Sequence, residues 1–191
     1  MEIDEKALWN KKYSERSHSS PDPDPFLVTA YDEFLSGNPP GNAFDVAGGV
    51  GRHAIWLAQR NWRVKLLDIS EVGIKQAEEN AKRAGTAASI SAAICDLNTM
   101  QDLGLEQYDL VVVFFFLQRE LFPALTAALK PGGFLIYKTY TAEQKHFIGG
   151  PSHPMFLLEP NELLRAFSSL RVLHYHETVQ EKGVAELVAR K

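Results

Sequence analysis

The chain has 191 residues, a length that fits one domain with a sizeable buried core. Its formal net charge is −4 at pH 7, and its basic residues never run longer than a pair. Surfaces that bind nucleic acid are basic and clustered, so the composition disfavours nucleic acid as a partner.

Cysteine content and hydropathy bear on where the protein works. Cys95 is the single cysteine, which excludes an internal disulfide and fits a reducing compartment. The first twelve residues lack an apolar signal core, and the longest apolar run, residues 110–117, is too short to span a bilayer. We therefore expect a cytoplasmic protein that does not enter a membrane.

Two helices are predicted ahead of the first strand. Residues 4–15 can begin at a capping Asp4 and have a narrow apolar face. Residues 26–35 form a stronger amphipathic helix. A polar segment broken by prolines joins the two. About forty residues, 1–40, thus precede the first strand as a helical segment.

The most informative stretch is a glycine turn between a strand and a helix. Residues 44–47 indicate a short buried strand, the glycines at 48, 49 and 51 allow a sharp turn, and residues 52–61 have helical spacing. Such a turn directs helix N-terminal amides toward a ligand. Asp68 closes the next strand, 63–67, where a carboxylate can accept two hydrogen bonds from a ribose diol.

The remaining pattern alternates strands and helices before it ends in a hairpin. Residues 108–114 are almost continuously apolar, which is typical of a strand covered on both faces. The other expected elements are a helix from Ser70 to a stop at Gly85, a strand at 88–94, a helix at 121–129, a strand at 134–138, an irregular segment at 139–158, a helix at 160–167, and two strands joined around residues 181–183.

This order predicts an α/β fold: a Rossmann-like, seven-stranded, mostly parallel sheet with helices on both faces and a C-terminal antiparallel hairpin. Ligands of such sheets bind beyond the carboxyl ends of the strands. The glycine turn, Asp68, Asp96 and Phe114 all follow or end predicted strands. We therefore expect the functional site at that edge.

The glycine turn resembles a known family. Residues 45–51, DVAGGVG, are similar to the first motif of class I S-adenosylmethionine (SAM) dependent methyltransferases, D/E-x-G-x-G-x-G. Ala47 stands where the motif has its first glycine, and we expect a negative φ there, at which a methyl group is tolerated. Residues 51–70 resemble more narrowly the small tellurite-resistance and thiopurine-type methyltransferases, and this resemblance covers nearly the whole of 1–191, read as one methyltransferase domain.

The resemblance implies SAM as cofactor, S-adenosylhomocysteine as its product, and a small-molecule acceptor bound by a monomer or homodimer. It implies a lid over the cofactor from residues 1–40 and an acceptor-side wall from residues 139–158. Asp96 would accept a hydrogen bond from the adenine amino group. Ile69 and Leu97 would pack on the two faces of the adenine. The cofactor-binding set is Asp45, Ala47, Gly48, Gly49, Gly51, Arg52, Asp68, Ile69, Asp96, Leu97 and Phe114.

The predicted acceptor side combines aromatic and cationic residues: Tyr13, Phe115, Arg119, Lys138, His146 and His153. Arg119 and Lys138 are the candidates for a catalytic role. A cationic fringe suits an anionic acceptor such as a thiolate or a chalcogen oxyanion, for which no general base is obligatory. The related subfamily often carries an acid where this chain has Lys138.

Two other functions remain open. Residues 49–54 also match the dinucleotide fingerprint G-x-G-x-x-G/A, which would make the chain an NAD(P)-dependent oxidoreductase. A non-catalytic SAM-binding module is the other alternative. His174 and His176 share a strand face, but a metal site needs a further ligand, so we expect no metal.

Overall fold

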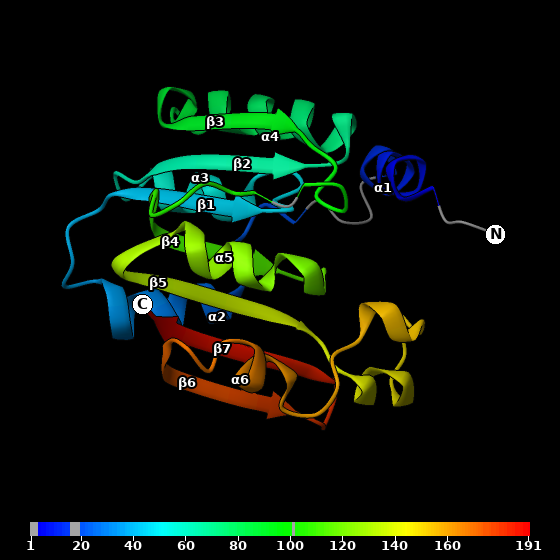
Figure 1. Cartoon of the computed structure of the whole chain (residues 1–191). Coiled ribbons are helices and arrows are strands. Elements are labelled where there is room, and N and C mark those ends of the chain that lie inside the picture. The colour runs from blue at the N-terminus through cyan, green and yellow to red at the C-terminus, as the bar shows by residue number, and fades with distance from the viewer. Residues whose placement is uncertain (1–3, 16–19, 101) are drawn as a thin grey trace. The chain divides into compact units, whose positions relative to one another are not determined.

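The structure is a computed structural model that describes residues 4–15, 20–100 and 102–191. It divides into two compact units, Met1–Met100 and Gln101–Lys191, each of which is described by itself. Figure 1 labels the helices and strands. The expected N-terminal lid, 1–40, lies partly outside the described residues, and the expectation of a single domain stays a prediction.

The first unit begins with the two predicted helices. Helix α1 spans Glu5–Ser14, and the Asp4 carboxylate caps it by accepting a hydrogen bond from the backbone N–H of Ala7 at 2.9 Å. The second predicted helix is divided: α2 covers Pro25–Ala30, and a π-helical turn continues it over Tyr31–Leu35. Both predicted helices are confirmed.

Three parallel strands form the sheet of the first unit, in the order β3-β2-β1. They are β1 (Asn42–Val46), β2 (Arg63–Asp68) and β3 (Ile90–Ile94), with α3 (Arg52–Ala58) and α4 (Glu71–Arg83) packed against them. Because the strands run in the same direction, their carboxyl ends meet at one edge. Helix α1 lies beyond this edge (Figure 1).

Helix α4 shows how the sequence pattern sets the packing. Its apolar stripe, Ile74, Ala77 and Ala81, is buried. The Ser70 hydroxyl caps it by accepting a hydrogen bond from the Gly73 backbone N–H at 3.0 Å. The predicted helix from Ser70 to a stop at Gly85 is confirmed, although Ala84, the fourth residue of the predicted stripe, is exposed after the end of α4. The cap and the buried residues fix α4 so that its first turn lies beside the end of β2.

The second unit has four strands in the order β4-β5-β7-β6. Strands β4 (Tyr108–Phe114) and β5 (Leu129–Tyr140) are parallel, and β7 (Val184–Arg190) runs antiparallel to both β5 and β6 (Arg171–Thr178). The interior of β4 is fully buried, as its apolar run predicts. The helices of this unit are α5 (Phe122–Ala128) and α6 (Glu162–Ala166).

Two boundaries differ from the sequence prediction. Strand β5 begins at Leu129, because a register shift between Tyr108 and Leu110 lets the segment containing two glycines stay in the sheet. Helix α6 begins only at Glu162, because Asn161 adopts a left-handed φ of 58° that a helix cannot include. Residues 139–158 contain short 3₁₀ turns at Ala142–His146 and Pro154–Phe156, as expected of an irregular segment.

The described residues thus contain the seven predicted strands, parallel except at β7, which pairs antiparallel with β5 and β6. The predicted fold class, an α/β Rossmann-like fold with a C-terminal antiparallel hairpin, is confirmed.

Candidate active site

The glycine turn after β1 has three residues with left-handed backbone: Ala47 at φ 54°, Gly49 at 56° and Gly51 at 80°. The expected negative φ at Ala47 is therefore wrong. The chain reverses so sharply at the strand end that the first position of the turn also needs positive φ, and glycine adopts that geometry without steric cost. Ala47 consequently carries a local strain of about 1–2 kcal/mol.

Replacing Ala47 with glycine should stabilise the protein. Relief of the left-handed strain outweighs the extra chain entropy of glycine by about 0.5–1 kcal/mol. Urea unfolding of A47G against the parent protein measures this difference. The control is Ala43→Gly in β1, which should destabilise because its site is buried and without positive φ. Equal destabilisation by both variants would contradict the assignment.

Asp68, at the end of β2, is held against the glycine turn. One carboxylate oxygen accepts a hydrogen bond from the Gly49 backbone N–H and the other from that of Ser70, each at 2.8 Å. The side chain is buried, and burial raises the pKa of Asp68, while these two hydrogen bonds oppose that rise. A carboxylate has about four acceptor positions, so about two remain for a ligand.

Asp45 lies beneath the turn. Its residue is only 1% exposed, and its Oδ2 accepts a hydrogen bond from the Ala54 backbone N–H at 3.1 Å. A Cβ at Gly48 would come within 2.7 Å of the Asp45 carboxyl group, so only glycine fits between turn and carboxylate. These contacts show that Asp45 supports the turn from below, and its predicted contact with the cofactor stays a prediction.

The burial of Asp45 predicts a pH-dependent stability. Desolvation raises its pKa from 3.8 to about 7, against the opposing hydrogen bond from Ala54. The pKa of Asp45 is higher in the folded than in the unfolded protein. The contribution of protonated Asp45 to the free energy of unfolding is therefore fully present below about pH 4 and is lost as the pH rises through 7. Asp45→Asn imitates the neutral acid, so its stability relative to the parent should rise on the order of 3 kcal/mol between pH 4 and pH 8.

Denaturant unfolding at several pH values tests this difference. Asp109→Asn is the matched control, because Asp109 forms a half-exposed ion pair with Lys130 at 2.8 Å. Parallel pH profiles for Asp45→Asn and the parent would show that Asp45 is ionised throughout the range.

Tyr13 of α1 packs onto the glycine turn. Its ring lies against Gly49 on one side and Gly73 of α4 on the other, where an added Cβ would overlap the Tyr13 hydroxyl or approach its ring to 3.0 Å. The residue is 6% exposed, and burial raises the pKa of the Tyr13 phenol, with Asp68 and Asp45 adding to the rise. A ligand above Gly49 therefore requires the Tyr13 side chain to move.

Asn10 holds α1 in this position. Its Oδ1 accepts hydrogen bonds from the Ser70 hydroxyl at 2.6 Å and the Val72 backbone N–H at 3.4 Å. The Gln76 side chain adds a hydrogen bond to the Tyr13 carbonyl at 3.1 Å. These polar contacts join α1 to the first turns of α4 and bring Tyr13 to the turn.

The other predicted cofactor residues of the first unit lie at its strand ends. Asp96 follows β3, and its Oδ1 accepts a hydrogen bond from the Asn98 backbone N–H at 2.9 Å. Leu97 is buried and Ile69 is half-buried. Arg52 is the first residue of α3 and lowers the pKa of Asp45 electrostatically.

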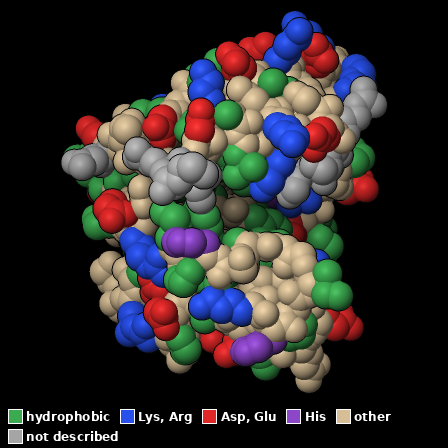
Figure 2. Space-filling model, turned by 90° about the vertical axis from the view of Figure 1, so that its right-hand side faces the viewer, with side chains coloured by type: hydrophobic (Ala, Val, Ile, Leu, Met, Phe, Trp, Pro, Cys, Tyr) green, Lys and Arg blue, Asp and Glu red, His purple; other side chains and the backbone are tan. Residues whose placement is uncertain are grey.

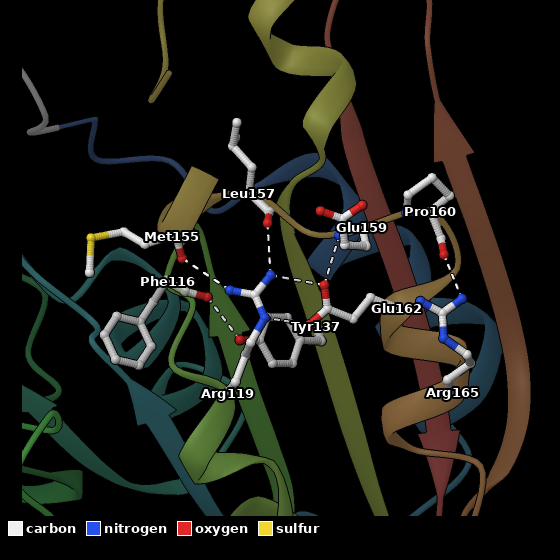
Figure 3. A network of polar contacts seen from close by, with 9 residues as sticks. All are labelled: Phe116, Arg119, Tyr137, Met155, Leu157, Glu159, Pro160, Glu162 and Arg165. Carbon is white, nitrogen blue, oxygen red and sulfur yellow. Dashed lines mark hydrogen bonds and ion pairs between the residues drawn. The ribbon is translucent and has the colours of Figure 1, made fainter. Parts of the chain in front are cut away.

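In the second unit, Arg119 anchors the loop before α6 (Figure 3). Its guanidinium pairs with Glu162 through two hydrogen bonds, the shorter at 2.6 Å. It also donates to the carbonyls of Met155 at 3.2 Å and Leu157 at 2.8 Å. These contacts favour a role in positioning the 154–158 segment over the predicted contact with an acceptor.

The remaining polar residues of the predicted acceptor side also have partners. Lys138 at the end of β5 forms an ion pair with Glu186 at 2.9 Å. His146 is exposed and lies 3.1 Å from Glu143. The His153 Nδ1 accepts a hydrogen bond from the Met155 backbone N–H at 3.3 Å. Phe114 is the buried last residue of β4, and Phe115 and Tyr140 pack together at the ends of β4 and β5.

Sequence reasoning missed several of these residues. Glycine is unfavourable inside a helix, so Gly73 within α4 is a signal that another side chain packs closely there. Asn10 gives no such signal, because its hydrogen bonds depend on how α1 docks. Glu162 and Glu186 look like ordinary surface acids in sequence, and only the structure places them on Arg119 and Lys138.

Comparison with known families bears on the glycine turn directly. Residues 43–133 match the methyltransferase-domain family. The matched segment is slightly less than half of the chain, and it contains the glycine turn, Asp68 and β4. The methyltransferase-domain match supports the first-motif resemblance at residues 45–51. No curated protein matches the chain.

Solved structures share the methyltransferase fold. A structure from a study of the conversion of a disulfide bond into a thioacetal group during echinomycin biosynthesis superposes with a TM-score of 0.73, at 16% identity over 97% of this chain and 91% of that one. TehB from Haemophilus influenzae superposes with a TM-score of 0.71, at 19% identity over 95% of this chain and 67% of that one. A SAM dependent methyltransferase from Aquifex aeolicus superposes with a TM-score of 0.68, at 18% identity over 95% of this chain and 97% of that one. At these identities the likeness shows the fold.

Three further observations concern the part of the chain that the structure describes. In residues 4–15, 20–100 and 102–191, no helix is long and apolar enough to cross a bilayer. Within the same ranges, no three His, Cys, Asp or Glu side chains gather as metal ligands. On the face drawn in Figure 2, Lys and Arg side chains lie among Asp and Glu side chains.

Proposed function

We propose that this chain transfers a methyl group from SAM to a small-molecule acceptor. The observation that carries the proposal is the Asp68 carboxylate, which is held at 2.8 Å from the Gly49 backbone N–H of a left-handed glycine turn. The methyltransferase-domain match to residues 43–133 supports SAM as the cofactor.

The residues around the turn fit an adenosine-bearing cofactor. Asp68 retains acceptor positions for a ribose diol, because its two backbone hydrogen bonds use about half of them. Gly49 has no side chain to block a ligand. Asp96 lies at the carboxyl end of the neighbouring parallel strand, where the adenine would reach it. The same carboxylate would also suit the ribose of NAD, so binding measurements must separate the two cofactors.

SAM, when bound, supplies an electrophilic methyl group on a positively charged sulfur. Asp68 would hold the ribose, and the buried Asp45 would keep the turn in shape by its hydrogen bond to Ala54. Positioning and the exclusion of water supply much of the rate in such a transfer, because the sulfonium charge disappears along the reaction.

Helix α1 would act as a lid in this proposal. Tyr13 occupies the space above Gly49, and Asn10 fastens the helix to α4 through Ser70. Cofactor entry would then displace Tyr13, after which its phenol could cover the bound sulfonium. The contacts of Asn10 are polar and few, so the helix can lift without unfolding the sheet.

Titration calorimetry with SAM, S-adenosylhomocysteine and NAD tests the cofactor, and release of S-adenosylhomocysteine over a panel of small acceptors tests turnover. We expect SAM and S-adenosylhomocysteine to bind and NAD not to bind. Binding of NAD alone would favour the oxidoreductase. Binding of SAM without turnover on any thiol, oxyanion, phenol or amine would favour the non-catalytic module.

A further inference from the structure

Phe115, directly after β4, has a strained backbone. Its φ is 57°, a conformation that is rare for a bulky residue, and two hydrogen bonds hold it. The Phe115 N–H donates to the Lys138 carbonyl at 2.7 Å, and the Tyr137 hydroxyl donates to the Phe116 carbonyl at 2.8 Å (Figure 3). Strain of this kind persists where surrounding structure enforces it, often at a ligand site.

The strain places an aromatic pair at the carboxyl ends of two parallel strands. The rings of Phe115 and Tyr140 lie 5.0 Å apart between centroids with a tilt of 42°, and both residues are half-buried. Ligands of open α/β sheets bind at this edge. The pair therefore presents partly exposed aromatic rings against which a small molecule can pack.

The two cations predicted to contact the acceptor, Lys138 and Arg119, are both paired with acids. Lys138 lies 5.9 Å from the Phe115 ring centroid, but its ammonium is paired with Glu186 and both side chains are less than one-fifth exposed. Arg119 is likewise paired with Glu162 (Figure 3). An anionic acceptor would have to break a partly buried ion pair to gain a cationic partner, which is costly.

We infer that Phe115 and Tyr140 form the acceptor subsite and that it selects an uncharged acceptor with a flat aromatic face. This inference rests on the proposed methyl transfer and replaces the anionic acceptor expected from sequence. In the reaction, an oxygen, nitrogen or sulfur of the acceptor forms a bond to the methyl carbon as the carbon–sulfonium bond breaks. The thioether product retains the electron pair of that bond, and the acceptor's proton leaves to water.

The experiment compares neutral phenols and anilines with the same rings bearing a carboxylate, and with selenite and tellurite. The variants are Phe115→Ala, Phe115→Tyr and Tyr140→Ala. The control is Phe116→Ala, which removes the neighbouring ring but keeps the backbone carbonyl that accepts the hydrogen bond from Tyr137. Calorimetry measures SAM affinity for each, circular dichroism checks the fold, and release of S-adenosylhomocysteine measures kcat and KM. Binding of the same rings to protein saturated with S-adenosylhomocysteine provides a readout without turnover.

We expect neutral rings to bind and react at least about tenfold better than their carboxylated analogues. Phe115→Ala should raise the KM for them about tenfold with SAM affinity unchanged, Phe115→Tyr should retain activity, and Phe116→Ala should match the parent. Preference for the charged rings or the oxyanions, or no effect of Phe115→Ala on ring binding or KM, would overturn the inference. Failure of SAM to bind would instead reject the proposed function. In that case, binding of the rings to the parent protein and to Phe115→Ala without any cofactor would still test the subsite.

Discussion

Replacing Asp68 with alanine should weaken SAM binding about 100-fold or more. The variant loses the proposed acceptor of the ribose hydroxyls, and each hydrogen bond to a charged group contributes about 1.5–3 kcal/mol. It also leaves the N–H groups of Gly49 and Ser70 without the partner that orients them. Titration calorimetry with SAM and with adenosine measures the loss, and both ligands should be affected because both carry the ribose.

Two further variants show whether the effect belongs to this carboxylate. Asp96→Ala removes the proposed adenine contact together with the local hydrogen bond from the Asn98 N–H, and it should weaken SAM binding about tenfold. Asp109→Ala removes a carboxylate from the half-exposed ion pair with Lys130 and should leave affinity unchanged. An Asp68→Ala protein that folds normally and binds SAM as the parent does would rule out the proposed site.

Replacing Gly49 with alanine should also weaken SAM binding about 100-fold. Gly49 has a φ of 56°, and a Cβ there would stand in the space now held by the Tyr13 hydroxyl. The methyl group would obstruct the approach of a ligand to the turn, and the left-handed backbone adds about 1–2 kcal/mol of strain.

Strain and obstruction can be separated with a second glycine. Gly85, after α4, has a φ of 71°, but nothing lies within 4 Å of an added Cβ. Gly85→Ala should therefore lose similar stability in urea unfolding while keeping the affinity for SAM. If both variants bind SAM equally well, the cofactor does not approach Gly49.

Local patterns predicted the frame of the fold well. The continuous apolar run of β4 and the Ser70 cap of α4 each depend on neighbours in the chain, and the structure confirms them. Boundaries were less certain where a local signal was weak: β5 extends through a pair of glycines because pairing with β4 compensates for them.

The candidate site was only partly predictable, because its contacts join segments far apart in the chain. The glycine turn and Asp68 could be placed together from the parallel strands alone, and the structure puts them 2.8 Å apart. The conformation of Ala47 could not be predicted from sequence, because the φ of a residue in a tight turn depends on the course of the chain on both sides. The partners of Arg119 and Lys138 could not be predicted from sequence, because charge pairing is decided by folding, and their acceptor-side roles stay predictions.

The sequence alone determined the order of strands and helices, the glycine turn and the acid that follows the second strand, because hydrophobic period and glycine placement act over a few residues. Only the tertiary structure decided that Tyr13 lies on Gly49, that Asp45 is buried beneath the turn, and that Arg119 and Lys138 are paired with acids. These contacts arise when distant segments pack and exclude water, and that environment sets the charge and accessibility of each group.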